Sequence, residues 1–378
     1  MNAADRAAGM LVYGTGTPGC GGRIRSSPDD FKVREVLSDA ALREIGRGGR
    51  YAVYLLRKRG IDTMHAIREA RSATGLRLKA LGLKDADAAT VQFVSSTRAG
   101  SHAPASGARW SLEAAGSAPR PLSAGDMEAN EFEITIRGAG PAPPPDVSRL
   151  PNFYGRQRFG SSRPVTHLVG RHIVRGDLGA AVAELTTWEG APDGAEARLA
   201  AMPRWMDAER AVLSEMIRTG DPLRAMRAAP VQSRRLYVQA YQSYIFNLAL
   251  SAAVVAGEDL GPADGDVCYG AGGRLSKYSG DPSQSATIPL AGHSYYARTR
   301  FDRYVAQAMG GEDVRHAGFA AGELGEAACE GGFRQAAMTC TGFSMEGGVA
   351  RFRLSRGSYA TVLLREVVKP EDPGAAGF

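Results

Sequence analysis

The hydrophobic pattern of the chain changes its period twice, and this change constrains the fold most strongly. Up to about residue 175, short segments of alternating apolar and polar residues, typical of half-buried strands, are separated by turns and a helical pattern. Residues 176–331 are rich in alanine and follow mainly helical patterns, and the mixed pattern returns over 332–378. At 378 residues the chain is long enough for two domains. We therefore predict a domain formed by residues 1–175 and 332–378 and interrupted by a second domain.

The charge balance favours a polyanionic partner without establishing one. The formal net charge is +6, from 46 Lys and Arg against 40 Asp and Glu, and arginine far outnumbers lysine. Guanidinium groups suit bidentate contacts to phosphates. A GC-rich genome would also favour arginine codons, so composition alone leaves nucleic-acid binding as one interpretation among others.

Several classes of protein are not indicated by the sequence. The four cysteines are widely spaced with no C-x-x-C pair, and the six histidines show no H-E-x-x-H or comparable spacing, so we predict reduced thiols and no metal site. The N-terminus lacks the pattern of a secretory signal, and the longest apolar run, 248–256, is too short to span a bilayer. We expect a cytoplasmic protein without a membrane segment.

An aspartate lies in a turn between two predicted elements. Residues 50–60 form a strand candidate, Thr63 is the predicted N-cap of a helix over 64–73, and the run 90–94 alternates as a half-buried strand does. Asp85 would thus lie in or beside a loop that enters a strand, where functional residues are common. A lone Lys-Asp step in a turn containing glycine is usually only a solvated turn.

A functional role for this aspartate requires a partner. A carboxylate beside an arginine is held ionised and can act as a nucleophile or a base. Arg25, which flanks a Ser-Pro-Asp-Asp turn, is a candidate cation, although sequence separation alone cannot place it near Asp85.

The segment PNFYGRQRFG at 151–160 combines three aromatic residues, two arginines and a glutamine in ten positions. It could be a core-forming loop whose arginines extend to water. Alternatively it could handle an extruded nucleobase, with Asn152 as an amide, Tyr154 as a stacking face, and Arg156 and Arg158 as phosphate contacts.

A long helix is predicted over residues 233–254. Leu236, Ala240, Tyr244 and Leu248 recur at spacing i, i+4, which is more typical of a core face than of a binding face. Arg234, Arg235 and Gln242 lie off this stripe and could contact a partner.

These segments, in this order, resemble the TruD family of tRNA pseudouridine synthases over nearly the whole chain. The matching motifs are IRSSPDDFKVRE, RKRGIDT, GLKDADAATVQ, NEFEITIR, PNFYGRQRFG, QAYQSYIFN and GSYATVLLRE. The resemblance implies a mixed α/β (α+β) fold, in which a pseudouridine synthase core of mixed antiparallel sheet and helices is interrupted by an inserted α/β TRUD domain at 176–331. Seven ordered motifs are far more specific than any one of them.

The resemblance also implies a reaction and roles for residues. Asp85 matches the catalytic aspartate, Arg25 the family's basic partner, and Asn152 and Tyr154 its Asn-x-aromatic pair. Family members commonly have lysine at the position of Arg25 and phenylalanine at that of Tyr154, so both residues depart conservatively. The implied activity is isomerisation of a D-arm uridine of tRNA, uridine 13, without cofactor or metal. We expect a monomer, although the sequence does not show the oligomeric state. The cations expected to contact RNA are Lys84, Arg156, Arg158, Arg234 and Arg235.

Two other classes of function remain open at this stage. A catalytically inactive RNA-binding protein or RNA chaperone would need the basic surface and the aromatic segment but no particular carboxylate. A nucleotide-binding enzyme would use the glycine-rich stretch GTGTPGCGG at 14–22, although no adequate strand precedes it and its spacing differs from G-x-G-x-x-G.

Overall fold

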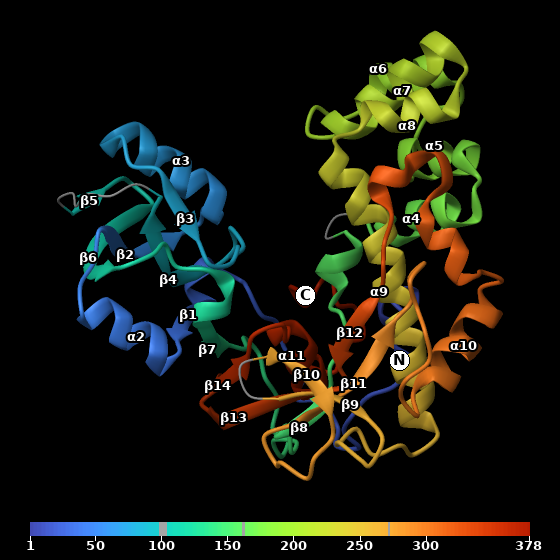
Figure 1. Ribbon diagram of the computed structural model, residues 1–378. Helices are drawn as coiled ribbons and strands as arrows, with labels where there is room; N and C mark the ends of the chain where they lie inside the picture. The colour runs from blue at the N-terminus through green and yellow to red at the C-terminus, as the bar shows by residue number, and fades with distance from the viewer. Residues whose placement is uncertain (98–103, 161–162, 271–272) are drawn as a thin grey trace. The chain divides into compact units, whose positions relative to one another are not determined.

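The computed structural model describes residues 1–97, 104–160, 163–270 and 273–378, which form two compact units (Figure 1). The sheet unit comprises Thr15–Leu150 and Met338–Phe378, and the helical unit comprises Met1–Gly14 and Pro151–Ala337. The chain therefore leaves the sheet unit after residue 150, whereas the sequence pattern predicted the exchange at 176. The difference arises because the aromatic segment and the helix that follows it pack on the long helix of the helical unit.

The sheet unit is built on one mixed sheet. Over the described residues it has ten strands in the order β5-β6-β2-β4-β1-β7-β14-β13-β8, with β3 paired to β4. The strands β1 and β4 run parallel. Strand β1 pairs antiparallel with β7, and β2 pairs antiparallel with β4 and β6. The strands are β1 (Phe31–Leu37), β2 (Tyr51–Arg59), β3 (Leu78–Ala80), β4 (Ala89–Ser96), β5 (Ala105–Ser106), β6 (Trp110–Ala118), β7 (Met127–Thr135), β8 (Arg149–Pro151), β13 (Ala337–Glu346) and β14 (Val349–Ser355).

The alternation of side chains along the strands separates a buried face from an exposed one. In β1, Phe31, Val33 and Glu35 are buried, whereas Lys32 and Arg34 are exposed. Cross-strand aromatic contacts extend the buried face, with the ring of Phe132 on β7 edge-on to Phe31 and stacked on Phe352. The strands expected at 50–60 and 90–94 are confirmed as β2 and β4.

The helices of the sheet unit are α2 (Asp39–Gly46), α3 (Thr63–Thr74) and α11 (Ala360–Val368). The expected helix after residue 63 is confirmed, and it ends at Gly75 in the left-handed conformation. The predicted cap was wrong: the Asp62 carboxylate accepts the N–H groups of Met64 and His65, so Asp62 is the N-cap. The hydroxyl of Thr63 therefore does not cap the helix and can bond to other groups.

The helical unit contains most of the remaining helices and a small sheet. Its strands follow the order β10-β9-β11-β12 over the described residues. Its elements are α1 (Ala3–Ala7), α4 (Thr166–Arg175), α5 (Leu178–Thr186), α6 (Ala195–Ala201), α7 (Asp207–Thr219), α8 (Pro222–Ala228), α9 (Val231–Val255), β9 (Val267–Tyr269), β10 (Leu275–Lys277), β11 (Ser285–Leu290), α10 (Asp302–Gly311) and β12 (Gly332–Gln335). The fold is mixed α+β, as expected.

The long helix α9 is the centre of the helical unit, and its buried face differs from the predicted one. Leu236 keeps 40% of its surface exposed, whereas Arg234 and Gln242 are buried. The amide of Gln242 donates to the carbonyl of Ala291 at 2.6 Å. Because α9 is covered on several sides, its buried residues do not follow one i, i+4 stripe.

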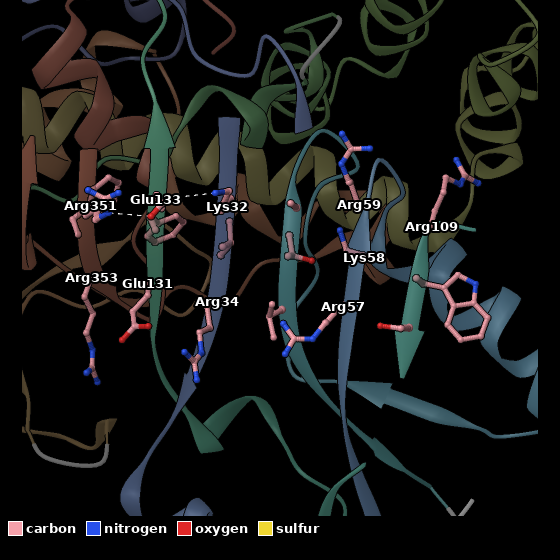
Figure 2. Close-up of a pocket in the computed structure, with 18 of the residues that line it drawn as sticks. Lys32, Arg34, Arg57, Lys58, Arg59, Arg109, Glu131, Glu133, Arg351 and Arg353 are labelled. Atoms are coloured by element: carbon pink, nitrogen blue, oxygen red, sulfur yellow. Dashed lines mark hydrogen bonds and ion pairs between the residues drawn. The ribbon is translucent and has the colours of Figure 1, made fainter. Parts of the chain in front are cut away.

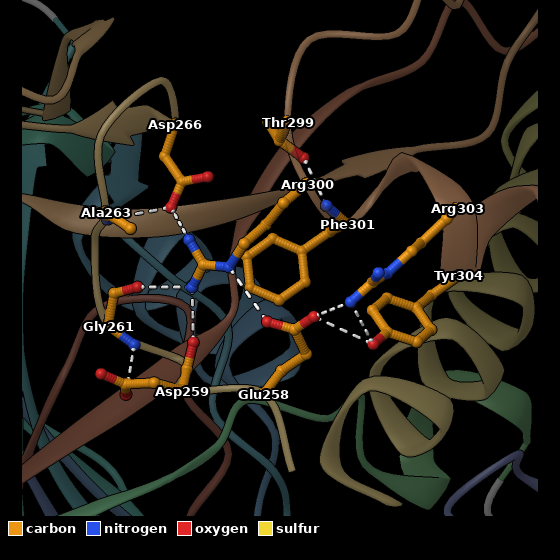
Figure 3. A network of polar contacts seen from close by, with 10 residues as sticks. All are labelled: Glu258, Asp259, Gly261, Ala263, Asp266, Thr299, Arg300, Phe301, Arg303 and Tyr304. Atoms are coloured by element: carbon orange, nitrogen blue, oxygen red, sulfur yellow. Dashed lines mark hydrogen bonds and ion pairs between the residues drawn. The ribbon is translucent and has the colours of Figure 1, made fainter. Parts of the chain in front are cut away.

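A polar network connects the segment after α9 to the start of α10 (Figure 3). The guanidinium of Arg300 pairs with Glu258 and Asp266 and also donates to the carbonyl of Gly261 at 2.8 Å. Glu258 in turn accepts from Tyr304 at 3.0 Å. With its charges paired, this network has a structural role.

None of the helices in the described part of the chain is long and apolar enough to cross a membrane.

Candidate active site

Asp85 lies in the loop that joins β3 to β4, as expected, and α3 holds this loop from one side. The hydroxyl of Thr63 accepts the N–H of Lys84 at 2.9 Å and donates to Gln92 at 2.9 Å. The amide of Gln92 donates to the carbonyl of Gly82 at 3.1 Å. The loop residue Asp85 is therefore presented on a main chain that is fixed by neighbouring elements.

The carboxylate of Asp85 forms an ion pair with Arg25, which is 60 residues away in the sequence. An Nη of Arg25 lies 3.1 Å from an Oδ of Asp85, and the two side chains are 13% and 56% exposed. The guanidinium also lies over the ring of Phe31, 4.3 Å from its centre. Arg25 has a φ of 54°, a conformation that is uncommon for a residue with a side chain. A partly buried cation thus faces a carboxylate that solvent can reach.

Burial lowers the pKa of the Arg25 guanidinium, while the charges of Asp85 and Asp87 oppose that shift. An arginine remains protonated across the physiological range even so. Arg25 therefore supplies a permanent positive charge beside Asp85.

A second ion pair lies under the same loop. The ammonium of Lys84 is 3.0 Å from Glu35, whose side chain is fully buried and also accepts the N–H of Phe93 at 2.8 Å. Burial raises the pKa of Glu35, and the charge of Lys84 opposes that shift. The carboxylate of Glu35 thereby connects the loop to β1 and β4.

Asn152 and Tyr154 lie in the helical unit, where they form a cluster with an arginine that sequence reasoning missed. Arg334 donates to the side-chain oxygen of Asn152 at 2.9 Å and to its carbonyl at 3.1 Å. The guanidinium carbon of Arg334 lies 3.9 Å from the centre of the Tyr154 ring, which also meets Phe246 edge-on. Asn152 is 2% exposed, so its contact is with Arg334 rather than with solvent.

The cations that we expected to contact RNA differ in availability. Arg235 is exposed, and Arg156 and Arg158 are partly exposed. Arg158 donates to Ser243 at 3.2 Å. Lys84 is held by Glu35, and Arg234 is 6% exposed and ion-paired with Glu326 at 3.1 Å. Because α9 turns the Arg234 side chain inward, it offers little surface to a partner, and its contact with RNA stays a prediction.

A hollow of about 880 Å³ in the sheet unit lies over the exposed face of the sheet (Figure 2). Figure 2 shows two rows of charged side chains crossing the strands there. The cations that line it form the ion pairs Lys32 and Arg351 with Glu133, Arg57 with Glu113, Arg59 with Asp29, Arg109 with Glu69, and Arg353 with Glu128. Because carboxylates already neutralise most of these cations, we interpret this face as a network of solvated surface salt bridges. Asp85 does not line this hollow.

No metal centre is found in the described ranges: no group of three or more His, Cys, Asp or Glu side chains there could hold an ion. His102 lies outside the described residues. The four cysteines, Cys20, Cys268, Cys329 and Cys340, are free and buried.

Comparison with known proteins gives matches along nearly the whole chain. The family model described as tRNA pseudouridine synthase D (TruD) matches residues 7–367. A relative from Pyrobaculum neutrophilum, named "Probable tRNA pseudouridine synthase D", is 32% identical, with 99% of this chain and 98% of the relative covered. A relative of the same name from Halobacterium salinarum is 29% identical, with 97% of each chain covered.

A solved structure gives the same result. A crystal structure of the protein from Methanosarcina mazei described as "Putative tRNA pseudouridine synthase D (TruD)" matches with a TM-score of 0.77 and 26% identity, covering 97% of this chain and 98% of the other. Sequence and fold together define an isomerase that converts uridine to pseudouridine in tRNA. The chain belongs to the TruD family of tRNA pseudouridine synthases.

Proposed function

We propose that the protein isomerises uridine 13 in the D-arm of tRNA, with Asp85 as the catalytic carboxylate and without a cofactor. The observation that carries this proposal is the pair of Arg25 and Asp85. A carboxylate that solvent reaches lies 3.1 Å from a permanent cation, on a loop fixed by hydrogen bonds to α3 and β4. Such a carboxylate is ready to meet a nucleoside without first being released from a buried site.

The reaction is an exchange of one glycosidic bond for another. The bond from ribose C1′ to N1 of uracil breaks, the base turns, and a bond from C1′ to C5 forms. The C5 proton leaves, and N1 gains a proton, so the atoms balance without oxidation or reduction. Asp85 could attack C1′ to form a covalent adduct, or it could take the C2′ proton to give a glycal.

In either route, other residues of the protein would have defined tasks. Arg25 keeps a positive charge beside the carboxylate while Asp85 gains and loses its own charge during the cycle. Tyr154, with Arg334 against its ring, would offer a stacking surface for a base. Asn152 would act through Arg334 as a positioning residue.

The test uses unmodified tRNA transcript with wild type and Asp85→Asn. The substitution keeps the shape of the side chain but removes its charge and basicity. We expect pseudouridine at position 13 with wild type only, mapped by carbodiimide-dependent stops in primer extension, while both proteins bind the transcript equally. The matched control is Asp87→Asn, because Asp87 is exposed on the same loop and should not be required.

The outcomes separate the alternatives. Conversion by Asp85→Asn at the wild-type rate would assign the chemistry to another group. If wild type binds tRNA but converts no uridine, an RNA-binding protein becomes the better account. A transcript with cytidine at position 13 that still gains pseudouridine would contradict the proposed position.

A further inference from the structure

Lys58 on β2 is a buried ammonium beside the proposed catalytic loop. Its neighbours in sequence, Arg57 and Arg59, are exposed, whereas Lys58 is 3% exposed. Side chains alternate between the two faces of a strand, so Lys58 shares a face with the apolar residues Tyr54 and Leu56, both of which belong to the core under α3. An ammonium in such surroundings is costly unless it is paired or hydrogen-bonded.

The ammonium of Lys58 contacts Asp85, the proposed catalytic residue. Its Nζ donates to the main-chain carbonyl of Asp85 at 2.7 Å. The carbonyl belongs to the same residue as the carboxylate, so this bond restricts where the carboxylate can lie. Thr63 holds the preceding residue, Lys84, and Gln92 holds Gly82. Among these contacts to the main chain of the loop, Lys58 supplies a charged donor.

We propose that Lys58 is a positioning residue for Asp85, and that its protonated form holds the loop in the reactive arrangement and so gives pseudouridine formation an alkaline limit. This inference rests on the proposed role of Asp85. A hydrogen bond from a charged donor is roughly twice as strong as one from a neutral donor. Loss of the proton therefore weakens the support of the Asp85 carbonyl and removes a positive charge near the carboxylate.

The charged groups around Lys58 place its titration within the range of an enzyme assay. Burial lowers its pKa to about 8, the charges of Asp85 and Asp62 oppose that shift, and the charge of Lys84 adds to it. Lys84 is itself paired with Glu35. The cationic form prevails at neutral pH, and the neutral form prevails above about pH 8.

The experiment measures single-turnover conversion of tRNA with enzyme in excess, from pH 6 to pH 9. For wild type we expect the rate constant to fall by up to about tenfold between pH 7 and pH 9, as one proton is lost. For Lys58→Met we expect a low rate without this alkaline fall, and unchanged affinity for tRNA. Lys58→Arg, if it folds, should keep a charged donor and lose the alkaline fall.

Lys79→Met is the matched control, because Lys79 is an exposed lysine on strand β3 of the same sheet. It should reproduce the wild-type profile, including any contribution from the ionisation of uridine itself. An alkaline fall that persists unchanged in Lys58→Met, or a Lys58→Met variant with the full wild-type rate, overturns the proposal.

A measurement on wild type keeps the proposal testable if Lys58→Met fails to fold. The chain has only six lysines, so enzyme carrying lysine labelled with carbon-13 at the ε position should give a simple spectrum. We expect one ε-carbon signal to titrate near pH 8, and its assignment is checked by its absence in Lys58→Arg. Titration of all six signals above about pH 10 overturns the proposal.

The variants also separate a failure of this inference from a failure of the proposed function. If Asp85→Asn is fully active, the proposed function fails. If Asp85→Asn is inactive and Lys58→Met behaves like Lys79→Met, only this inference fails.

Discussion

At the scale of single residues, the environment of each charge decides what the residue can do. Arg25 and Lys58 are both cations of the sheet unit near Asp85, but they contact different atoms of it. Arg25 meets the carboxylate and Lys58 meets the carbonyl. A guanidinium is always protonated, whereas a buried ammonium can lose its proton near neutral pH. The first cation should therefore set the charge of the site at every pH, and the second should make its geometry depend on pH.

Substitution of Arg25 tests the first of these roles. We expect Arg25→Lys to retain most of the activity because an ammonium can also pair with Asp85, and Arg25→Met to lose on the order of 10² to 10³-fold in single-turnover rate at pH 7. The exposed Arg23, two residues earlier, provides the control Arg23→Met, which should convert tRNA at the wild-type rate. Equal rates for Arg25→Met and Arg23→Met would show that the ion pair has no part in the reaction.

At the scale of elements, α3 is a support for the catalytic loop as well as a part of the core. Its apolar face is buried against β2 through Ala66 and Ala70. Asp62 caps the helix, so the first helical residue, Thr63, has its hydroxyl free to accept from the loop. A short helix thereby sets the position of a loop whose residue Lys84 follows Thr63 by 21 residues.

The contribution of α3 can be measured with two substitutions of the same kind. Thr63→Val keeps the shape of a 1% exposed side chain but leaves the N–H of Lys84 and the oxygen of Gln92 without their partner. We expect a loss of about 1–3 kcal/mol in the free energy of unfolding, and a lower rate of conversion. Thr74→Val removes a hydroxyl that bonds within the last turn of the helix, and should leave the rate unchanged. Equal effects of both variants on the rate would contradict a specific role for the start of α3.

At the scale of the whole molecule, the two units should respond to acid over different ranges of pH. In the helical unit, burial lowers the pKa of His167 to about 4, opposed by a hydrogen bond with the main chain of Ala7. In the sheet unit, the hydrogen bond from Arg120 lowers the pKa of Asp126 to about 2. For both groups the folded pKa lies below the unfolded pKa, so stability is lost as pH falls from the unfolded value to the folded one. This loss begins near pH 6.5 for His167 and near pH 3.8 for Asp126.

His167→Phe should therefore reduce the acid sensitivity of the helical unit. The ring of His167 packs between Phe159 and Tyr244, at 5.0 Å from each, so an aromatic replacement can occupy its place. We expect wild type to lose about 3 kcal/mol of stability between pH 7 and pH 3 through this group, and the variant to keep it. Thermal unfolding at several pH values measures the difference. The exposed His293 provides the control His293→Phe, which should unfold like wild type.

The local features of this protein were determined by the sequence itself. The periods of two and of 3.6 residues predicted β2, β4 and α9, and the ordered motifs predicted the TruD family, because such patterns are complete within a few neighbouring residues. The sequence also contained a signal that Lys58 is buried, because this lysine occupies the inward-facing position two residues after Leu56 in an alternating strand. Only the tertiary structure decided that Arg25 meets Asp85, that Glu35 holds Lys84, and that Arg234 turns inward. Whether a charge meets water, a carboxylate or a carbonyl depends on what distant segments place beside it, and that information is not contained in the neighbouring sequence.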